Sequence, residues 1–144
     1  MNQYLAFAQK MELAYDAVCK PACREWGLPR TALDILLFLA NNPEYNTARD
    51  VVKVRRIKAN LVSVHVERLV REGYIERRPV EGDRRKTKLV CTERAEPVIA
   101  CGRALQRTFF ERLFRETDPA QLAVFEQVME GVSHSLDSIL KGEG

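Results

Sequence analysis

The chain has 144 residues, of which 46% are apolar and 30% are charged, and its formal net charge is +3. This length and composition fit one globular domain, or one small domain with extra helices. No run approaches the roughly 18 uncharged apolar residues of a membrane span, and the first residues lack the pattern of a secretory signal, so we expect a cytoplasmic protein with no membrane partner.

Residue types that carry catalysis or bind metals are sparse and scattered in this sequence. The four cysteines form neither a disulfide framework nor a CxxC zinc motif, and the two histidines, His65 and His134, lie far apart. No nucleophile elbow or phosphate-binding loop is recognisable. We therefore expect no enzyme activity, no cofactor and no metal centre.

Two helices are predicted at the start of the chain. Apolar residues recur at steps of three and four through residues 2–26, where we expect Pro21 to kink or restart the helix before Gly27 ends it. A second helix is predicted over Pro29–Ala40, with the proline in its first turn.

A helix-turn-helix pattern follows. Thr47-Ala48-Arg49-Asp50 has the spacing of a capping box, which predicts the start of a short helix. A tight turn at Arg55–Lys58 leads into another helix, and the second helix of such a pair lies in the DNA major groove. Arg56 stands where this turn commonly has glycine, and a left-handed backbone there costs about 1 kcal/mol for a residue with a side chain.

The second helix of the pair is amphipathic and is predicted to end at Gly73. Its apolar face carries Val62, His65, Val66 and Leu69 at helical spacing, and we expect His65 to be a packed, hydrogen-bonded imidazole. Its opposite face carries Asn60, Ser63, Val64, Glu67 and Arg68.

The next segment predicts a β-hairpin with the turn Val80-Glu81-Gly82-Asp83 and a basic tip. Between Lys53 and Lys88 there are twelve Lys/Arg and five Asp/Glu, an excess of seven positive charges, whereas the rest of the chain carries a net −4. A solvated charge run is the alternative explanation. Beside a helix-turn-helix, however, concentrated basic residues indicate a polyanion site, because each one placed near a phosphate releases condensed counterions.

Two further helices are predicted after the hairpin. Thr92 can cap the first, although Pro97 indicates that its regular part begins near residue 97, from where it runs to about Phe114. Asp118-Pro119-Ala120-Gln121 combines a cap, a proline at the first position and a capping-box partner, and predicts the start of the last helix. The apolar stripe of that helix continues to Ile139, and a stripe of this length needs a partner surface.

At these residues the chain resembles the MarR family of bacterial winged-helix regulators, mainly over residues 27–92. The family's pattern of leucine, glycine, an apolar pair and arginine appears in Leu69-Val70-Arg71-Glu72-Gly73-Tyr74-Ile75-Glu76-Arg77. Its wing signature appears as Asp83-Arg84-Arg85 followed by Leu89-Val90-Cys91-Thr92. The chain departs from the family at Arg56, at His65 in place of leucine, and at Ala95 and Pro97, where a glycine and an uninterrupted helix are usual.

The resemblance implies a mainly α fold with a small β-hairpin (α+β). It places a winged helix-turn-helix over residues 29–92 and a helical dimerisation region over residues 1–28 and 93–144. It also implies a homodimeric transcriptional regulator, a repressor by analogy, that binds pseudo-palindromic double-stranded DNA. The predicted DNA-binding residues are Lys58, Asn60, Ser63, Val64, Arg68, Arg84, Arg85 and Lys86. Because many members carry a base-reading arginine where this chain has Val64, we expect a different target sequence.

Asp83 is predicted to order the wing. Its carboxylate can accept a bidentate contact from Arg84 or Arg85, or bond backbone N–H groups in the turn. The alternative is that aspartate was selected only for turn formation with Gly82.

Control by a small molecule is the predicted mode of regulation. The resemblance suggests a pocket for a small apolar or aromatic ligand where the first two helices and the helix over residues 97–114 meet the DNA-binding lobe. The competing switch is oxidation of Cys19 and Cys23, whose Cβ atoms lie about 5 to 6 Å apart on a regular helix. A disulfide needs about 4 Å, so the helix would have to distort near Pro21.

A winged helix can also serve as a protein-interaction or RNA-binding module, because fold does not determine function. The arginine-rich wing and the scarcity of aromatics on the exposed helix face argue against this alternative.

Overall fold

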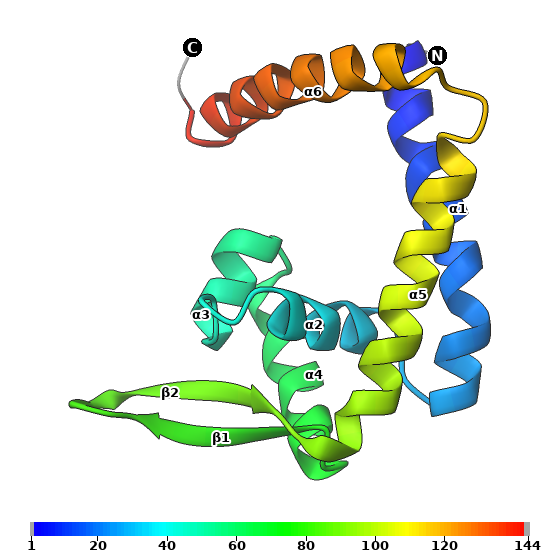
Figure 1. Cartoon of the computed structure of the whole chain (residues 1–144). Helices are drawn as coiled ribbons and strands as arrows, with labels where there is room; N and C mark the ends of the chain where they lie inside the picture. Colours follow the sequence, from blue (N-terminus) through cyan, green and yellow to red (C-terminus); the bar gives the residue numbers. More distant parts are fainter. Residues whose placement is uncertain (1, 143–144) are drawn as a thin grey trace. The chain divides into compact units, whose positions relative to one another are not determined.

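A computed structural model describes residues 2–142, which form helices and one antiparallel two-stranded sheet (Figure 1). The helices are α1 (Gln3–Trp26), α2 (Arg30–Asn41), α3 (Ala48–Asp50), α4 (Ala59–Arg71), α5 (Glu96–Leu113) and α6 (Pro119–Leu140). The strands are β1 (Ile75–Val80) and β2 (Asp83–Cys91). This arrangement confirms the predicted mainly α fold with a single hairpin.

The chain divides into two compact units, Met1–Arg107 and Thr108–Gly144. The first unit contains α1, the helix-turn-helix, the hairpin and the first part of α5. The predicted division into a DNA-binding lobe (29–92) and a dimerisation region (1–28 and 93–144) concerns the role of each segment, and it stays a prediction.

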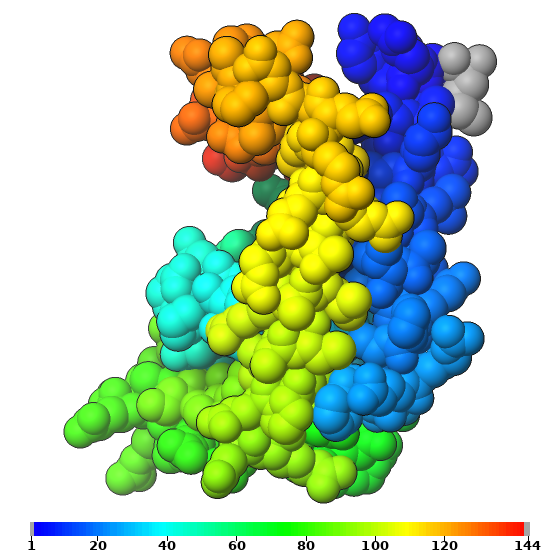
Figure 2. Space-filling view, turned by 45° about the vertical axis from the view of Figure 1, so that its right-hand side comes forward, coloured from blue at the N-terminus to red at the C-terminus, as the bar shows by residue number. Residues whose placement is uncertain are grey.

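Helix α2 forms the centre of the core of the first unit. Its buried residues are Ala32, Leu33, Ile35, Leu36, Leu37, Phe38 and Leu39. A helix that is apolar on all sides belongs in a core, and full burial of each large aliphatic side chain stabilises the fold by about 1.5 to 3 kcal/mol. Side chains of α1, α4, β1 and the start of α5 complete this cluster, among them Cys19, Val62, Ile75 and Val98. Figure 2 shows the first part of α5 running over the surface of this unit.

Helix α1 continues through Pro21 without a break and ends at Gly27, whose φ of 65° is left-handed. The predicted end is confirmed, whereas the predicted restart is wrong. Cys19 and Ala22 are both buried, and their packing holds the helix on either side of the proline. Tertiary packing therefore outweighs the single backbone hydrogen bond that proline removes.

The capping box at the start of α3 is confirmed. The Thr47 Oγ1 accepts from the Asp50 N–H at 3.1 Å, and an Asp50 carboxylate oxygen accepts from the Thr47 N–H at 3.2 Å. The chain continues as a π-helical stretch, Val51–Arg55, which is followed by Arg56 in the left-handed conformation at φ 63°. The turn therefore has the backbone that glycine would favour, and Arg56 adopts it at the cost considered above.

Thr92 occupies the N-cap position of a 3-10 turn, but its side chain does not make the cap bond that we considered. The Thr92 hydroxyl donates to the Gly73 carbonyl at 2.6 Å, and a 3-10 turn, Glu93–Ala95, precedes α5. Helix α5 begins at Glu96 and has Pro97 in its first turn, which confirms the predicted start near residue 97. The hairpin brings Thr92 back beside Gly73, which follows α4, and the hydroxyl therefore bonds the Gly73 carbonyl instead of capping a helix.

In the second unit, α6 begins as predicted, with the Asp118 carboxylate accepting from the Ala120 N–H at 2.9 Å and Pro119 as the first residue. Many of its large apolar side chains are exposed in the single chain. They are Val124, Phe125, Val128, Met129, Val132, Leu136, Ile139 and Leu140. Within residues 2–142, no helix is both long and apolar enough to cross a membrane.

Candidate nucleic-acid interface

The outward face of α4 carries the residues predicted to read bases. Val62, Val66 and Leu69 are buried against the core, so the helical period turns Asn60, Ser63 and Val64 outward. All three are exposed, and Val64 keeps 63% of its surface accessible although its side chain is apolar. Lys58, the residue before α4, is exposed too. The face offers an amide, a hydroxyl and a methyl surface, which are groups that read base edges in a major groove.

The hairpin carries the second predicted set of contacts. Strands β1 and β2 pair from Ile75↔Cys91 to Val80↔Asp83, and the register shifts between Pro79 and Val80. Gly82, with φ 82°, makes the sharp turn at the tip. The three basic residues that follow, Arg84, Arg85 and Lys86, are all exposed.

Asp83 orders the backbone of this tip. Its Oδ1 accepts a hydrogen bond from the Arg85 N–H at 2.9 Å. This is the backbone contact that the sequence left open beside a bidentate arginine contact. Within residues 2–142 the Asp83 carboxylate therefore contacts the backbone of the tip rather than a guanidinium, and its wing-ordering role stays a prediction.

The base of the hairpin is fastened to the helix-turn-helix. The Leu89 N–H donates to the carbonyl of Asn46, in the loop before α3, at 2.7 Å, and the Thr92 N–H donates to the Tyr74 carbonyl at 3.0 Å. The Arg94 guanidinium lies over the Tyr74 ring, 5.1 Å from its centroid. From this base the hairpin extends well beyond α3 and α4 (Figure 1).

A groove of about 320 Å³ lies between α3, α4 and the hairpin. Its polar wall includes Arg49, Ser63, Arg77 and Thr87. Arg49 and Arg77 are exposed basic residues that we did not predict as site residues. Arg77 lies in the quoted family pattern and Arg49 in the capping box, so their positions were visible in the sequence. The sequence did not show, however, that both residues line the same groove as Ser63.

Arg68 differs from its predicted outward direction. Its guanidinium donates to the Glu72 carboxylate at 3.1 Å and to the Gly27 carbonyl at 2.7 Å. The side chain thereby joins the last turns of α4 to the end of α1. Its contact with DNA stays a prediction, and that contact has to compete with these two bonds.

His65 is half-buried on α4, which agrees with its predicted packing. Its Nδ1 atom is buried and has no hydrogen-bond partner in the described part of the chain. The hydrogen bond that we expected for this nitrogen is therefore not formed there. His134 is exposed on α6.

The predicted redox pair consists of free thiols. Cys19 is buried and Cys23 is half-buried in α1. Burial raises the pKa of the Cys19 thiol, and burial likewise raises the pKa of Cys23, with the nearby Asp34 carboxylate adding to the effect. Raised pKa values lower the fraction of reactive thiolate at neutral pH. This environment gives no support to an oxidation switch, which stays an untested alternative.

Comparisons with known proteins agree with this geometry. A family model described as MarR family matches residues 26–86. A putative MarR family transcriptional regulator from Listeria monocytogenes, solved in complex with a 26mer DNA, is 14% identical with a TM-score of 0.85, over 100% of this chain and 98% of that one.

Other solved structures give the same result. A MarR protein from Peptoclostridium difficile is 14% identical with a TM-score of 0.83, over 95% of this chain and 89% of that one. A MarR transcriptional regulator from Methanosarcina mazei is 16% identical with a TM-score of 0.75, over 94% and 99%. No curated protein sequence matches the chain. Residues 26–86 therefore match the MarR family in sequence, and the chain has the winged-helix fold of MarR regulators.

Proposed function

We propose that this protein is a sequence-specific transcriptional regulator that binds double-stranded DNA as a homodimer. The observation that carries the proposal is the combination of two exposed surfaces on one unit. The outward face of α4 offers groups that read base edges, and the wing extends Arg84, Arg85 and Lys86 beside it. Base contacts specify a sequence, whereas contacts from basic side chains to phosphates position the protein.

The proposal assigns the predicted residues to base contacts, to backbone or minor-groove contacts, and to ordering of the wing. Asn60, Ser63 and Val64 read bases, while Lys58 and Arg68 bind the backbone. Arg84, Arg85 and Lys86 bind the backbone or enter the minor groove, where narrow A·T tracts attract arginine. Asp83 orders the wing. The Listeria monocytogenes protein, which has a similar fold, was solved in complex with a 26mer DNA, and this supports the proposal that the present fold binds DNA.

Homodimerisation is part of the proposal. The exposed apolar side chains of α6, and those of α1 at Tyr4, Leu5 and Phe7, need a partner surface. A twofold dimer presents two copies of α4 to a pseudo-palindromic operator, with half-sites about 10 base pairs apart. We extend the proposal, by family analogy, to a repressor role, to a location in the bacterial cytoplasm and to a protein without enzyme activity.

Control by a small ligand is the last element of the proposal. A small apolar or aromatic compound is proposed to bind where α1 and α2 approach α5. There the Gln106 amide donates to the Tyr15 hydroxyl at 3.1 Å and links α5 to α1. A ligand needs to prefer the non-binding arrangement by only a few kcal/mol to release the operator.

A salt titration tests the central proposal. Duplexes selected from a random pool are compared with single-stranded RNA of the same sequence. We expect a preferred duplex, with the logarithm of its binding constant falling by about 0.9 per contacted phosphate for each unit in log salt. Equal or tighter binding to the RNA, or duplex binding that ignores salt, contradicts the proposal and favours the RNA or protein-interaction alternative.

A further inference from the structure

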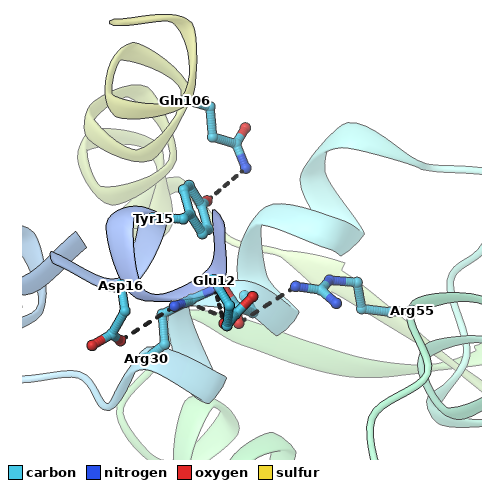
Figure 3. A network of polar contacts seen from close by, with 7 residues as sticks. Glu12, Tyr15, Asp16, Arg30, Arg55 and Gln106 are labelled. Carbon is cyan, nitrogen blue, oxygen red and sulfur yellow. Dashed lines mark hydrogen bonds and ion pairs between the residues drawn. The ribbon is translucent and has the colours of Figure 1, made fainter. Parts of the chain in front are cut away.

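A group of charged side chains joins α1, α2 and the turn before α4. Arg30, at the start of α2, is its centre (Figure 3). The Arg30 guanidinium lies 2.9 Å from Asp34, 3.2 Å from Asp16 and 3.2 Å from Glu12. It also lies 4.5 Å from the centroid of the Tyr15 ring. The Arg30 side chain is only 18% exposed, so most of this cation is removed from water.

The contacts of Arg30 differ in strength because their exposure differs. Glu12 is 71% exposed and Asp16 is 40% exposed, and water and salt screen such pairs strongly. Asp34 is only 12% exposed and receives the Arg30 Nε–H on both carboxylate oxygens, at 2.9 and 3.1 Å. The hydrogen bond and charge of Asp34 raise the pKa of Arg30, although burial alone would lower it. The ion pair between Arg30 and Asp34 is therefore the strongest interaction in the group.

Asp34 also reaches the helix-turn-helix. Its second carboxylate oxygen lies 3.5 Å from an Arg55 nitrogen, and Figure 3 shows Arg55 directed toward the group around Arg30. Arg55 is the last residue of the π-helical stretch and directly precedes Arg56, which has a left-handed backbone. Lys58, the residue before α4, makes no side-chain capping bond. A carboxylate anchored in α2 thus lies within ion-pair distance of one end of the turn from which α4 starts.

We propose that Asp34 is a positioning residue for operator recognition: anchored by Arg30, it holds Arg55 and thereby the turn that sets the start of α4. The inference rests on the proposed DNA-binding function. Asn60 and Ser63 lie in the first turns of α4, so movement of the turn displaces them first. A small displacement weakens base contacts, which require close geometry, more than phosphate contacts, which tolerate it.

The test compares Asp34→Asn with Arg55→Gln and with the double variant. Each protein is titrated with its selected operator and with a scrambled duplex of the same length, at several salt concentrations. The measured quantity is the ratio of the two affinities, and denaturant unfolding is recorded in parallel. Asp16→Asn is the matched control, because it removes the same charge from a carboxylate that contacts Arg30 but, within residues 2–142, not Arg55.

We expect Asp34→Asn to lower the ratio by about tenfold, the size of one weakened base contact. Affinity for the scrambled duplex should not fall, because the variant gains one unit of positive charge. Arg55→Gln should lower the ratio similarly, and the double variant should lose no more than the larger single loss. Asp16→Asn should keep the wild-type ratio.

Several results overturn the inference. An unchanged ratio in folded Asp34→Asn does so, as does a double variant whose losses multiply, since Asp34 then does not act through Arg55. If Asp34→Asn does not fold, Arg55→Gln decides alone. Arg55 is 41% exposed, and its replacement leaves the Asp34 carboxylate paired with Arg30. Equal loss on both duplexes then identifies a phosphate contact and contradicts positioning. A wild-type protein without operator preference overturns the DNA-binding proposal itself, and this inference with it.

Discussion

At the scale of single residues, the proposed interface combines side chains to which we assign different roles. Exposed arginines on the wing carry charge without burial, and the backbone that supports them is held by the Asp83 carboxylate. Asn60 on α4 carries no charge but presents a donor and an acceptor together. These two kinds of residue should therefore respond differently to substitution.

The double substitution Arg84→Ala/Arg85→Ala should weaken binding to every duplex and flatten the salt dependence. Each lost phosphate contact lowers the slope of log affinity against log salt by about 0.9. Fluorescence anisotropy at four or more salt concentrations measures this slope. Arg24→Ala, which removes an exposed charge from the last turn of α1, is the control for net charge. Wild-type affinity and slope in the double variant refute the role of the wing.

Asn60→Ala should reduce affinity for the selected operator by about 1 to 3 kcal/mol and relax preference at one base position. An Asn side chain can pair both polar atoms of an adenine edge, and alanine can pair neither. Repeated selection from a random pool shows the relaxed position. Lys58→Ala provides the contrast, since loss of a phosphate contact should weaken all sequences equally. An unchanged selected sequence in Asn60→Ala contradicts the proposed orientation of α4.

The thiols of Cys19 and Cys23 should react slowly with iodoacetamide at neutral pH. Burial raises both pKa values, so the thiolate fraction is small and increases only as the pH approaches the raised values. Mass spectrometry of the folded protein between pH 7 and 9, with a small free thiol as the reference, measures both rates. Rates above that of the reference at pH 7 would show an activated thiol and support the hypothesis of an oxidation switch.

At the scale of elements, close packing between helices decides which residue each position accepts. Gly102 on α5 is buried, and a Cβ added there would lie 2.5 Å from one methyl carbon of Leu37 and 2.8 Å from the other. Leu37 itself is only 2% exposed. The approach of α5 to α2 therefore depends on the absence of a side chain at residue 102.

Gly102→Ala should lower the free energy of unfolding by about 1 to 3 kcal/mol, because extra volume in a packed core forces neighbours out of their preferred rotamers. Gly131→Ala is the matched control, since a Cβ there meets no atom within 4 Å. Residue 131 is exposed in the single chain, so the same change there should stabilise by up to about 1 kcal/mol. Urea denaturation measures both, and equal stabilisation by the two substitutions contradicts the close packing.

At the scale of the whole molecule, the apolar face of α6 is the main argument for assembly. Val132 and Leu136 keep 52% and 53% of their surface exposed in the single chain. A contiguous apolar surface of this kind normally marks an interface. Two DNA-binding lobes also give an operator affinity that one lobe cannot reach.

Val132→Glu should shift the protein from dimer to monomer and greatly reduce operator affinity, because a carboxylate buried in an apolar interface lacks a partner. Analytical ultracentrifugation at micromolar concentration, with operator titration in parallel, tests both effects. Gln127→Glu introduces the same group at a polar position of α6 and should remain dimeric. A monomeric wild-type protein, or full affinity for an isolated half-site, refutes the dimer.

Local signals in the sequence determined the helix starts at Thr47 and Asp118, the left-handed Arg56 and the turn at Gly82. Each of these depends on atoms within about four residues, so the local pattern contains the cause. The same holds for the two faces of α4, because the helical period alone separates Val62 from Ser63.

Only the tertiary structure decided contacts between residues far apart in the chain. Arg68 bonds the Gly27 carbonyl 41 positions away, and the helical pattern of α4 contains nothing that predicts it. The continuity of α1 through Pro21 likewise depends on packing against the core, and the link from Arg30 through Asp34 to Arg55 depends on three elements meeting. Side-chain direction at such positions follows from whichever partner the fold brings within hydrogen-bonding distance, and residue type and spacing do not specify that partner.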